Sequence, residues 1–212
     1  MRGTKIAFFL AALLLAIPPG FTQSAFGYLS GITNPPPVTA QVHHEEGPGL
    51  LPADRVYVTI GAEKFAFLVP AGYKLEQSSG RVVTMATADY SCQIAFRLAG
   101  PMPADGGELN PGVYSAKVME TFPGAAILRT FSAFAEGRQG PAFEIQLTGA
   151  GGAARRGKLA FIPSRTSVLQ FSLTCSPEKF EEASRQLNTV MLTFRASDAQ
   201  GELHVSPLSD KL

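Results

Sequence analysis

The stretch RVYVTIGAEKFAFLV, residues 55–69, carries apolar side chains at alternate positions on both sides of a Gly-Ala connection. Alternation with period two is typical of half-buried strands, and a two-residue connection with glycine is typical of a hairpin. The same period recurs further along the chain, at Val83, Met85, Ile94, Phe96, Leu98, Phe143, Ile145, Leu147, Leu159, Phe161, Leu169, Phe171 and Leu173. We therefore predict a meandering, mainly antiparallel sheet.

The segment after the last of these strands has the period of a helix instead. Its apolar positions are Phe180, Ala183, Leu187, Val190, Met191 and Phe194, which share one helical face. Ser176 followed by Pro177 fits an N-cap and a first helical position. This pattern predicts a helix that closes the domain.

A second helix is expected after Asn110-Pro111, which again has the order of cap and proline. It would place Val113, Ala116 and Phe122 roughly on one side. Strands, a central helix, more strands and a closing helix add up to an α+β fold in which helices cover a mainly antiparallel sheet.

The N-terminus has the order of a secretory signal. Arg2 and Lys5 precede an apolar run over residues 6–17, which is followed by Pro18-Pro19-Gly20 and small residues. The run is shorter than the roughly 20 residues that a spanning helix needs, so we expect no transmembrane anchor after cleavage. We predict a signal peptide over residues 1–27 and a secreted or periplasmic location.

The exact cleavage point has two candidates, because Thr22-Gln23-Ser24 and Ala25-Phe26-Gly27 both offer suitable small residues. We favour the second, which leaves Tyr28 first. Residues 28–52 are rich in proline and read as a tether, residues 53–195 as a single α+β domain, and residues 196–212 as a flexible C-terminal tail.

The charge balance argues against a nucleic-acid partner. The chain carries 18 Lys and Arg against 17 Asp and Glu, and removal of the signal leaves it close to neutral. Nucleic-acid binders normally have a strong basic excess, because neutralising phosphates supplies most of their affinity.

The two cysteines are predicted to form a disulfide. Cys92 shares the parity of the apolar residues in its strand, and Cys175 shares that of Leu169, Phe171 and Leu173, so both point into the core. One begins its strand and the other ends its strand, which suits opposed positions on antiparallel neighbours. Export favours oxidation, and the bridge would stabilise the fold by about 4 kcal/mol. The alternative is two buried free thiols.

Catalytic chemistry based on histidine is not expected. His43, His44 and His204 all lie outside the predicted domain, so a serine or cysteine triad and a histidine-rich zinc site have no rigid imidazole. Catalysis by carboxylates alone needs no histidine and is not excluded. Its candidate residues are Asp89, Asp105, Glu108, Glu120 and Glu144. Such residues are usually solvated surface, so we assign no catalytic residue and no cofactor-binding residue.

Two further motifs are interpreted as structural. Residues 43–46, HHEE, have suitable metal ligands but lie in the predicted tether, so we favour a solvated polar patch and assign no metal residue. Residues 149–158 combine glycines with basic residues, but Lys158 is followed by Leu159 rather than Ser or Thr, and a strand follows instead of a helix. We predict a hairpin tip with basic flanks.

Two stretches carry a resemblance to a known family. KFAFLVPAGY, residues 64–73, resembles the strand and Pro-Gly-aromatic opening of the PsbP/Mog1-like domains, and residues 168–195 are similar to their final strand and helix. The resemblance implies an α/β/α sandwich around an antiparallel sheet. Members bind unrelated partners, from photosystem subunits to a small GTPase, so it implies no binding residue here.

These observations favour an exported, non-catalytic accessory or binding module that acts on a protein or cell-envelope partner, without a cofactor. The alternative is a small-ligand-binding protein or a carboxylate-based hydrolase in the same compartment. A pocket with converging acidic groups would favour that alternative.

Overall fold

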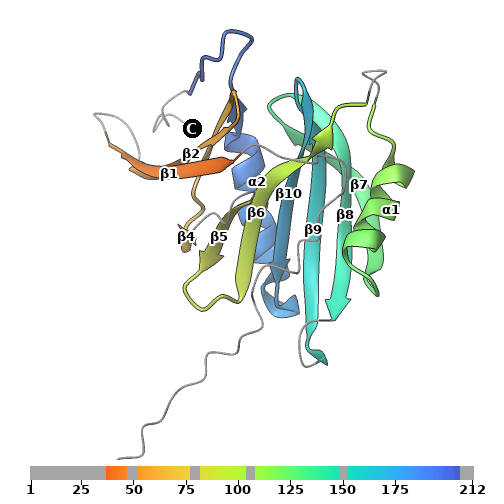
Figure 1. Cartoon of the computed structure of the whole chain (residues 1–212). Coiled ribbons are helices and arrows are strands. Elements are labelled where there is room, and N and C mark those ends of the chain that lie inside the picture. Colours follow the sequence, from red (N-terminus) through yellow and green to blue (C-terminus); the bar gives the residue numbers. More distant parts are fainter. Residues whose placement is uncertain (1–36, 47–51, 77–81, 104–107, 149–151, 206–212) are drawn as a thin grey trace, which may run out of the picture.

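The computed structural model describes residues 37–46, 52–76, 82–103, 108–148 and 152–205, and the predicted signal peptide lies outside them. Seven described strands form an antiparallel main sheet in the order β4-β5-β6-β10-β9-β8-β7 (Figure 1). They are β4 (Tyr73–Leu75), β5 (Val83–Thr87), β6 (Cys92–Pro101), β7 (Ala126–Ala135), β8 (Arg138–Thr148), β9 (Ala154–Pro163) and β10 (Ser167–Cys175). The predicted antiparallel pairing is confirmed, but the sheet is not a simple meander, because β6 pairs with β10 from near the end of the chain.

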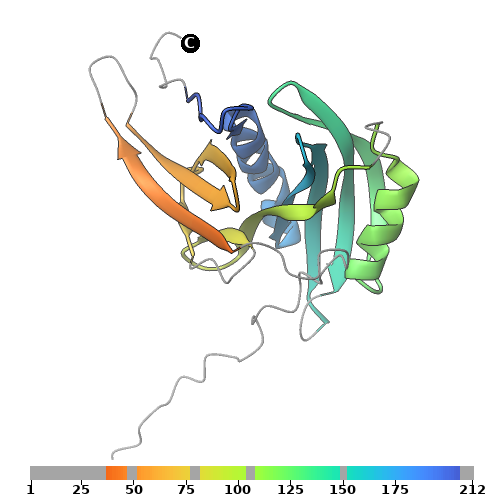
Figure 2. The same ribbon diagram turned by 45° about the horizontal axis from the view of Figure 1, so that its top comes forward.

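A smaller sheet has the order β1-β2-β3-β11, with β1 (Val38–Glu45), β2 (Ala53–Ile60), β3 (Glu63–Leu68) and β11 (Arg195–Ala196). The predicted hairpin is its centre, because Ile60 pairs with Glu63 across the turn at Gly61-Ala62. A positive φ of 62° at Gly61 explains why a residue without Cβ begins this turn. The β1–β2 hairpin reaches away from the main sheet (Figure 2).

Helix α2 (Phe180–Thr193) follows a 3-10 turn over Pro177–Lys179, close to the predicted start. Helix α1 (Pro111–Thr121) begins as predicted, since the Asn110 side chain accepts a hydrogen bond from Gly112 N at 2.8 Å. The face expected on α1 is only partly correct, since Phe122 is buried but Val113 and Ala116 are exposed. Tyr114, Val118 and Phe122 are buried, because the Tyr114 ring packs 4.7 Å from the ring of Phe161, and Val113 is 51% exposed.

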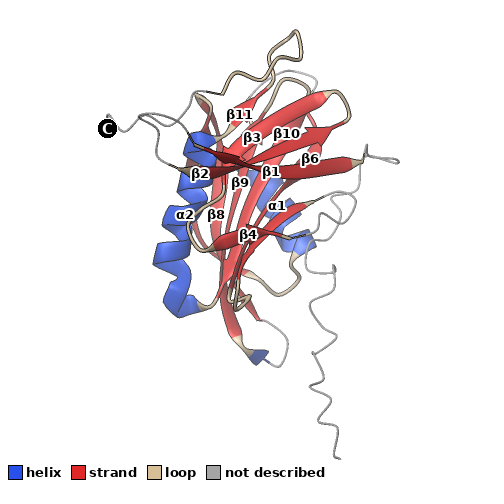
Figure 3. Ribbon diagram, turned by 90° about the vertical axis from the view of Figure 1, so that its left-hand side faces the viewer, coloured by secondary structure: helices blue, strands red, loops and turns tan. Residues whose placement is uncertain are grey.

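Two apolar cores lie on opposite faces of the main sheet. The larger one joins the main sheet to α2 and the smaller sheet, and Phe194 lies at its centre among Phe65, Phe67, Phe96 and Phe171. The smaller one lies between α1 and strands β8 and β9. Figure 3 shows the two helices on either side of the strands.

The helices cover the sheet less fully than predicted. Each covers part of one face, and strands make up most of the described structure, so the fold is a sheet-dominant α+β fold. Among the described residues no helix has the length and apolar character needed to span a membrane.

The structure corrects both boundaries of the predicted domain. Residues 38–45, expected in the tether, form strand β1, because their backbone pairs with β2 along its whole length. Ala196, expected in the tail, belongs to β11, and Ser197 N donates to Lys64 O at 2.8 Å. The remaining predicted tether, residues 28–36 and 47–51, and the end of the tail, 206–212, lie outside the described residues.

Candidate functional site

The acidic residues that were candidates for carboxylate chemistry lie on separate elements. Asp89 is in the β5–β6 turn and is bound by Lys179, while Glu144 on β8 is 3.5 Å from Arg156. Glu120 is exposed near the end of α1, and Glu108 is exposed in the segment that precedes this helix. Asp105 lies outside the described residues. No contact in the described part of the chain joins two of these carboxyl groups, so carboxylate hydrolysis gains no support.

A serine and a lysine meet at the same turn in a geometry that resembles a catalytic dyad. Lys179 Nζ lies 2.7 Å from Ser91 Oγ and 2.7 Å from Asp89 Oδ2. A base must be neutral to accept the serine proton. The bond to Asp89 raises the pKa of Lys179, and Lys179 in turn holds the pKa of Asp89 well below its usual range. The cluster therefore ties α2 to the turn and has no activated nucleophile.

The basic residues after the glycine-rich segment belong to β9, as the predicted hairpin implied, and residues 149–151 lie outside the described residues. Lys158 is buried, and its Nζ donates to Ser184 at 3.1 Å and to Asn188 at 3.0 Å on α2. Burial lowers the pKa of Lys158. This amine links the helix to the sheet.

Cys92 and Cys175 lie directly opposite each other and both face the larger core, which confirms their predicted placement. Ser176 N donates to Ser91 O at 3.2 Å, a bond that flanks the pair. The cysteines are thus a non-hydrogen-bonded pair, the type in which opposed side chains are closest. Both thiols are free in the structure, so the disulfide stays a prediction.

The histidines expected outside the fold are in ordered positions. His43 and His44 belong to β1, and His204 contacts Asp198 at 3.0 Å. His43 and His44 point to opposite faces because they are neighbours in a strand. Among the described residues no group of three or more His, Cys, Asp or Glu side chains is placed to hold a metal ion.

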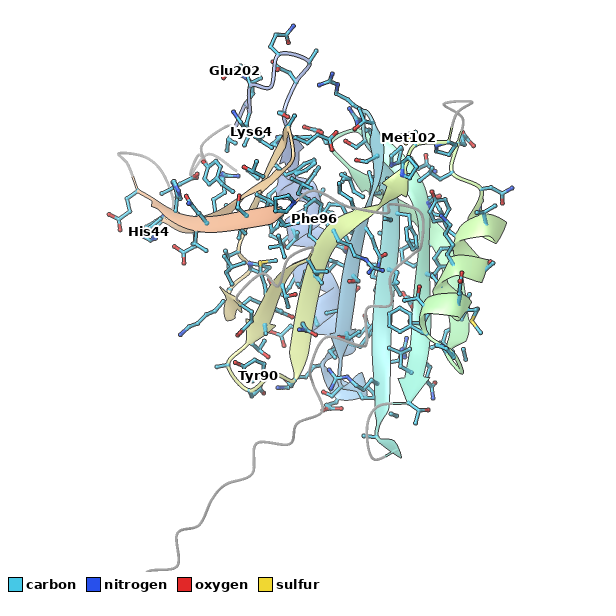
Figure 4. All side chains as sticks on the ribbon, viewed as in Figure 1. His44, Lys64, Tyr90, Phe96, Met102 and Glu202 are labelled. Atoms are coloured by element: carbon cyan, nitrogen blue, oxygen red, sulfur yellow. The ribbon has the colours of Figure 1, made fainter. Side chains whose placement is uncertain are left out.

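Strand β1 is the outermost strand of the smaller sheet, and the β1–β2 hairpin is called the arm below. The arm carries His44 well away from Phe96 in the core (Figure 4). The β1 side chains from Gln41 to His44 are exposed, and Val42, an apolar residue, is 41% exposed. A single exposed apolar residue is ordinary, so the feature that needs an explanation is the long outer strand itself.

The hydrogen bonds of β2 determine which backbone groups of β1 are free. Val69 N donates to Asp54 O at 2.8 Å, so Arg55 and Leu68, which lie opposite each other, are a non-hydrogen-bonded pair. Arg55 therefore directs its own N–H and C=O toward β1. Backbone directions alternate along a strand, so Tyr57 does the same.

On β1, His43 lies opposite Arg55 and Gln41 lies opposite Tyr57, and their backbone groups complete the hydrogen-bond ladder. Their neighbours Ala40, Val42 and His44 direct N–H and C=O away from β2. No described strand pairs with that side of β1. The arm thus presents a row of backbone donors and acceptors along one edge.

One face of the arm is held by an ion pair between the buried Arg55 and the partly exposed Glu45. Arg55 is 3% exposed, and its Nε donates to Glu45 Oε1 at 2.7 Å. The Tyr57 hydroxyl donates to the same oxygen at 3.0 Å, and the His43 ring packs 4.9 Å from the Tyr57 ring. The bond from Arg55 is the main cause of the lowered pKa of Glu45.

The other face is held by His44 at the end of the arm where β1 stops and β2 begins. Its Nδ1 lies 2.7 Å from Asp54 Oδ1 and its Nε2 lies 2.7 Å from Glu46 Oε1. Ionised carboxylates only accept hydrogen bonds, so both contacts are satisfied only when both ring nitrogens carry a proton. The bond to Asp54 and then the bond to Glu46 raise the pKa of His44.

No protein-family model matches this chain, and the search of curated proteins found no match. The chain is similar in fold to cyanobacterial PsbP from Synechocystis, with 13% identity, a TM-score of 0.45, and 77% of this chain and 95% of that chain covered. It is also similar to LpqN from Mycobacterium tuberculosis, described as involved in cell envelope biogenesis, with 15% identity, a TM-score of 0.39 and coverage of 76% and 92%.

A third similar structure is PA94 from Pseudomonas aeruginosa, with 16% identity, a TM-score of 0.38 and coverage of 58% and 88%. The predicted resemblance to PsbP-like domains therefore has a counterpart among these similar structures. At these identities the likeness concerns the chain trace and transfers no activity and no partner.

Sequence reasoning missed the arm because prolines precede it and polar residues dominate its second half. A signal was present, since Val38, Ala40 and Val42 alternate just before the predicted hairpin. These three lie opposite Ile60, Val58 and Val56, an extension of the same apolar face. Alternation over three small side chains is weak until the partner strand is known.

Proposed function

We propose that this chain is an exported, non-catalytic binding module that captures an extended segment of a protein partner along the free edge of β1. The partner belongs to the cell envelope or to the secreted proteins. Its segment would add one strand to the smaller sheet, with backbone hydrogen bonds to Ala40, Val42 and His44 supplying the recognition. The observation that carries this proposal is the unpaired edge of the arm.

A comparison of the sheet edges supports β1 as the docking strand. Proteins protect strand edges by keeping them short, by bulges and by charged side chains. Strand β4 has three residues and β11 has two, while β7 is interrupted by a bulge between Ile127 and Arg129. Strand β1 has eight residues in unbroken register and contains neither proline nor lysine. Its charged side chains, His44 and Glu45, lie at one end, so among the described edges it is the long one with no bulge and an uncharged middle.

The side-chain contacts on the two faces of the arm support the same proposal, because they order the arm before a partner binds. The ion pair of Arg55 and Glu45 holds one face, and the contacts of His44 hold the other. An edge strand that is already extended loses less conformational entropy when another strand is added to it.

Export is supported by the charged, apolar and small-residue order of residues 1–27. An exported chain reaches an oxidising compartment, where Cys92 and Cys175 would form the predicted disulfide. A module outside the cytoplasm has its partners among envelope and secreted proteins.

The test compares three variants of the arm. Val42→Pro removes a backbone N–H from the free edge and leaves the ladder to β2 intact, since proline is tolerated where the N–H faces solvent. Val42→Thr is the matched control, because it keeps that N–H and the strand propensity. Gln41→Pro removes a ladder hydrogen bond, and we expect it to lower the melting temperature more than Val42→Pro does.

The purified mature protein and these variants are used to recover partners from a native envelope extract. We expect a partner that the wild type and Val42→Thr retain and that Val42→Pro loses, with the variants equally folded by circular dichroism. A partner that binds Val42→Pro as well as the wild type would show that the edge is not the site. Repeated recovery of no partner by the wild type would count against the binding module itself.

A further inference from the structure

The position of the two cysteines in the ladder permits a bond between them without a change of register. Cys92 and Cys175 form a non-hydrogen-bonded antiparallel pair, in which Cα atoms lie about 4.5 Å apart. Disulfides span Cα separations of about 4.4–6.8 Å. The reduced and oxidised chains can therefore share one fold at this place.

The folded protein closes this site to reagents. Cys175 has no exposed surface and Cys92 is 4% exposed, and both are part of the larger core. The ring of Tyr73 is buried in the same core, where burial and then the adjacent Cys92 raise the pKa of its hydroxyl. A soluble oxidant thus has no open route to either sulfur.

The reactive form of the thiol is also suppressed. Disulfide exchange proceeds by attack of a thiolate. Burial, and then the nearby Cys92, raise the pKa of Cys175 to about 12. The thiolate of Cys175 is therefore scarce at pH 8, where about one quarter of an unfolded cysteine is thiolate.

We propose that Cys92 and Cys175 are a modification site that is oxidised only before β6 and β10 close around it, and that folding then preserves whichever redox state it encloses. The oxidant is a disulfide, such as oxidised glutathione or the disulfide of an oxidase. One thiolate attacks it to give a mixed disulfide and the first reduced thiol. The second thiolate then displaces the other, so that two protons and two electrons leave the chain and one S–S bond forms.

The consequence is a record of the compartment in which the chain folded. A chain that folds in an oxidising compartment would carry the bridge permanently, and one that folds under reducing conditions would keep two inert thiols. The inference rests on the proposed export only where it names an oxidising compartment. The oxidation chemistry itself is tested on the purified chain and does not depend on export. Failure of the test below leaves the proposed edge of β1 untouched.

The experiment exploits the fact that the chain has two cysteines, so a mass measurement after alkylation counts the free thiols without ambiguity. The reduced mature protein is first folded and then exposed to oxidised glutathione at pH 8. A second sample meets the same reagent while unfolded and is then refolded. We expect the unfolded sample to form the disulfide more than about tenfold faster than the folded one, because folding removes both sulfurs from the solvent.

Two tyrosine variants provide a matched pair. Tyr73→Ala removes the buried ring beside the thiols, and we expect oxidation of the folded dithiol to accelerate at least tenfold. Tyr90→Ala alters an exposed tyrosine close in sequence to Cys92, at 61% exposure, and should leave the rate unchanged. Should Tyr73→Ala not fold, the comparison of folded and unfolded wild type still decides the question.

Folded wild type that is oxidised within tenfold of the unfolded rate would overturn the inference. So would an unfolded sample that refolds under the oxidant with two free thiols or with stable mixed disulfides, because the pair would then not be the favoured product.

Discussion

Gly140 in β8 lies where the sheet leaves no room for a side chain. A Cβ built there would fall well inside van der Waals contact with the carbonyl oxygen of Phe161, 2.9 Å from its carbonyl carbon and 3.4 Å from Ile162 Cα. These neighbours are backbone atoms of β9, which cannot turn aside as a side chain can. The Gly140→Ala variant must push β8 and β9 apart at this point.

The expected cost follows from comparing this glycine with two others. Overpacking a closed site costs about 1–3 kcal/mol, and each strained ladder hydrogen bond adds about 1 kcal/mol, so Gly140→Ala should lose about 3 kcal/mol or more. Gly157→Ala would meet Ile145 Cγ1 at 2.9 Å and Leu173 O at 3.2 Å, where the isoleucine can move, so it should lose less. Gly137→Ala has open space but a φ of 71°, which costs about 1 kcal/mol.

Urea denaturation at 25 °C, followed by circular dichroism, gives the free energy of unfolding of the wild type and the three variants in one redox state. We expect the loss to fall in the order Gly140→Ala, Gly157→Ala, Gly137→Ala. A Gly140→Ala protein that loses no more stability than Gly137→Ala would refute the close approach of β8 and β9.

Three further predictions concern charged groups. Glu45→Gln should lower the free energy of unfolding, measured in urea, by about 1–2 kcal/mol because it leaves the buried Arg55 guanidinium without its carboxylate. Since the pKa of Glu45 is lowered in the folded protein, the wild type loses this stability as the pH falls below 4.5, and the variant shows no such loss. In an NMR titration His44 should titrate above 6.5, and the Asp54→Asn variant should lower the pKa of His44. The contribution of protonated His44 to the order of the arm is present below pH 6.5 and is lost as the pH rises through the raised pKa of His44. Lys158→Met should change the free energy of unfolding by less than about 1 kcal/mol or raise it, because the buried amine has neutral partners; wild-type stability should rise as pH passes the lowered pKa of Lys158, and that rise should be absent in the variant.

The elements of the main sheet show how far local pattern extends. The alternating apolar residues of β6 and β10 predicted both strands and the side on which Cys92 and Cys175 lie. The same rule did not predict β7, where a bulge between Ile127 and Arg129 breaks the alternation. The buried face of α1 was predicted only for Phe122, because apolar side chains lie on both sides of this helix and the sheet selects one of them.

The candidate site depended more on distant contacts. The sequence identified the HHEE stretch as polar, but it placed His44 in a tether because the partners of that strand were not evident. Asp54 lies ten positions away and reaches His44 only through the register of β1 on β2.

The sequence alone determined the period of the strands, the caps of the helices, the inward direction of the cysteines and the signal-like N-terminus. Each of these is a local pattern of side chains. Only the tertiary structure decided the order of the strands, the edge of β1 that has no described neighbour, and the closed surroundings of the two thiols. Those features arise from pairing between segments far apart in the chain, where the free energy of burial and hydrogen bonding depends on the partner and not on the segment itself.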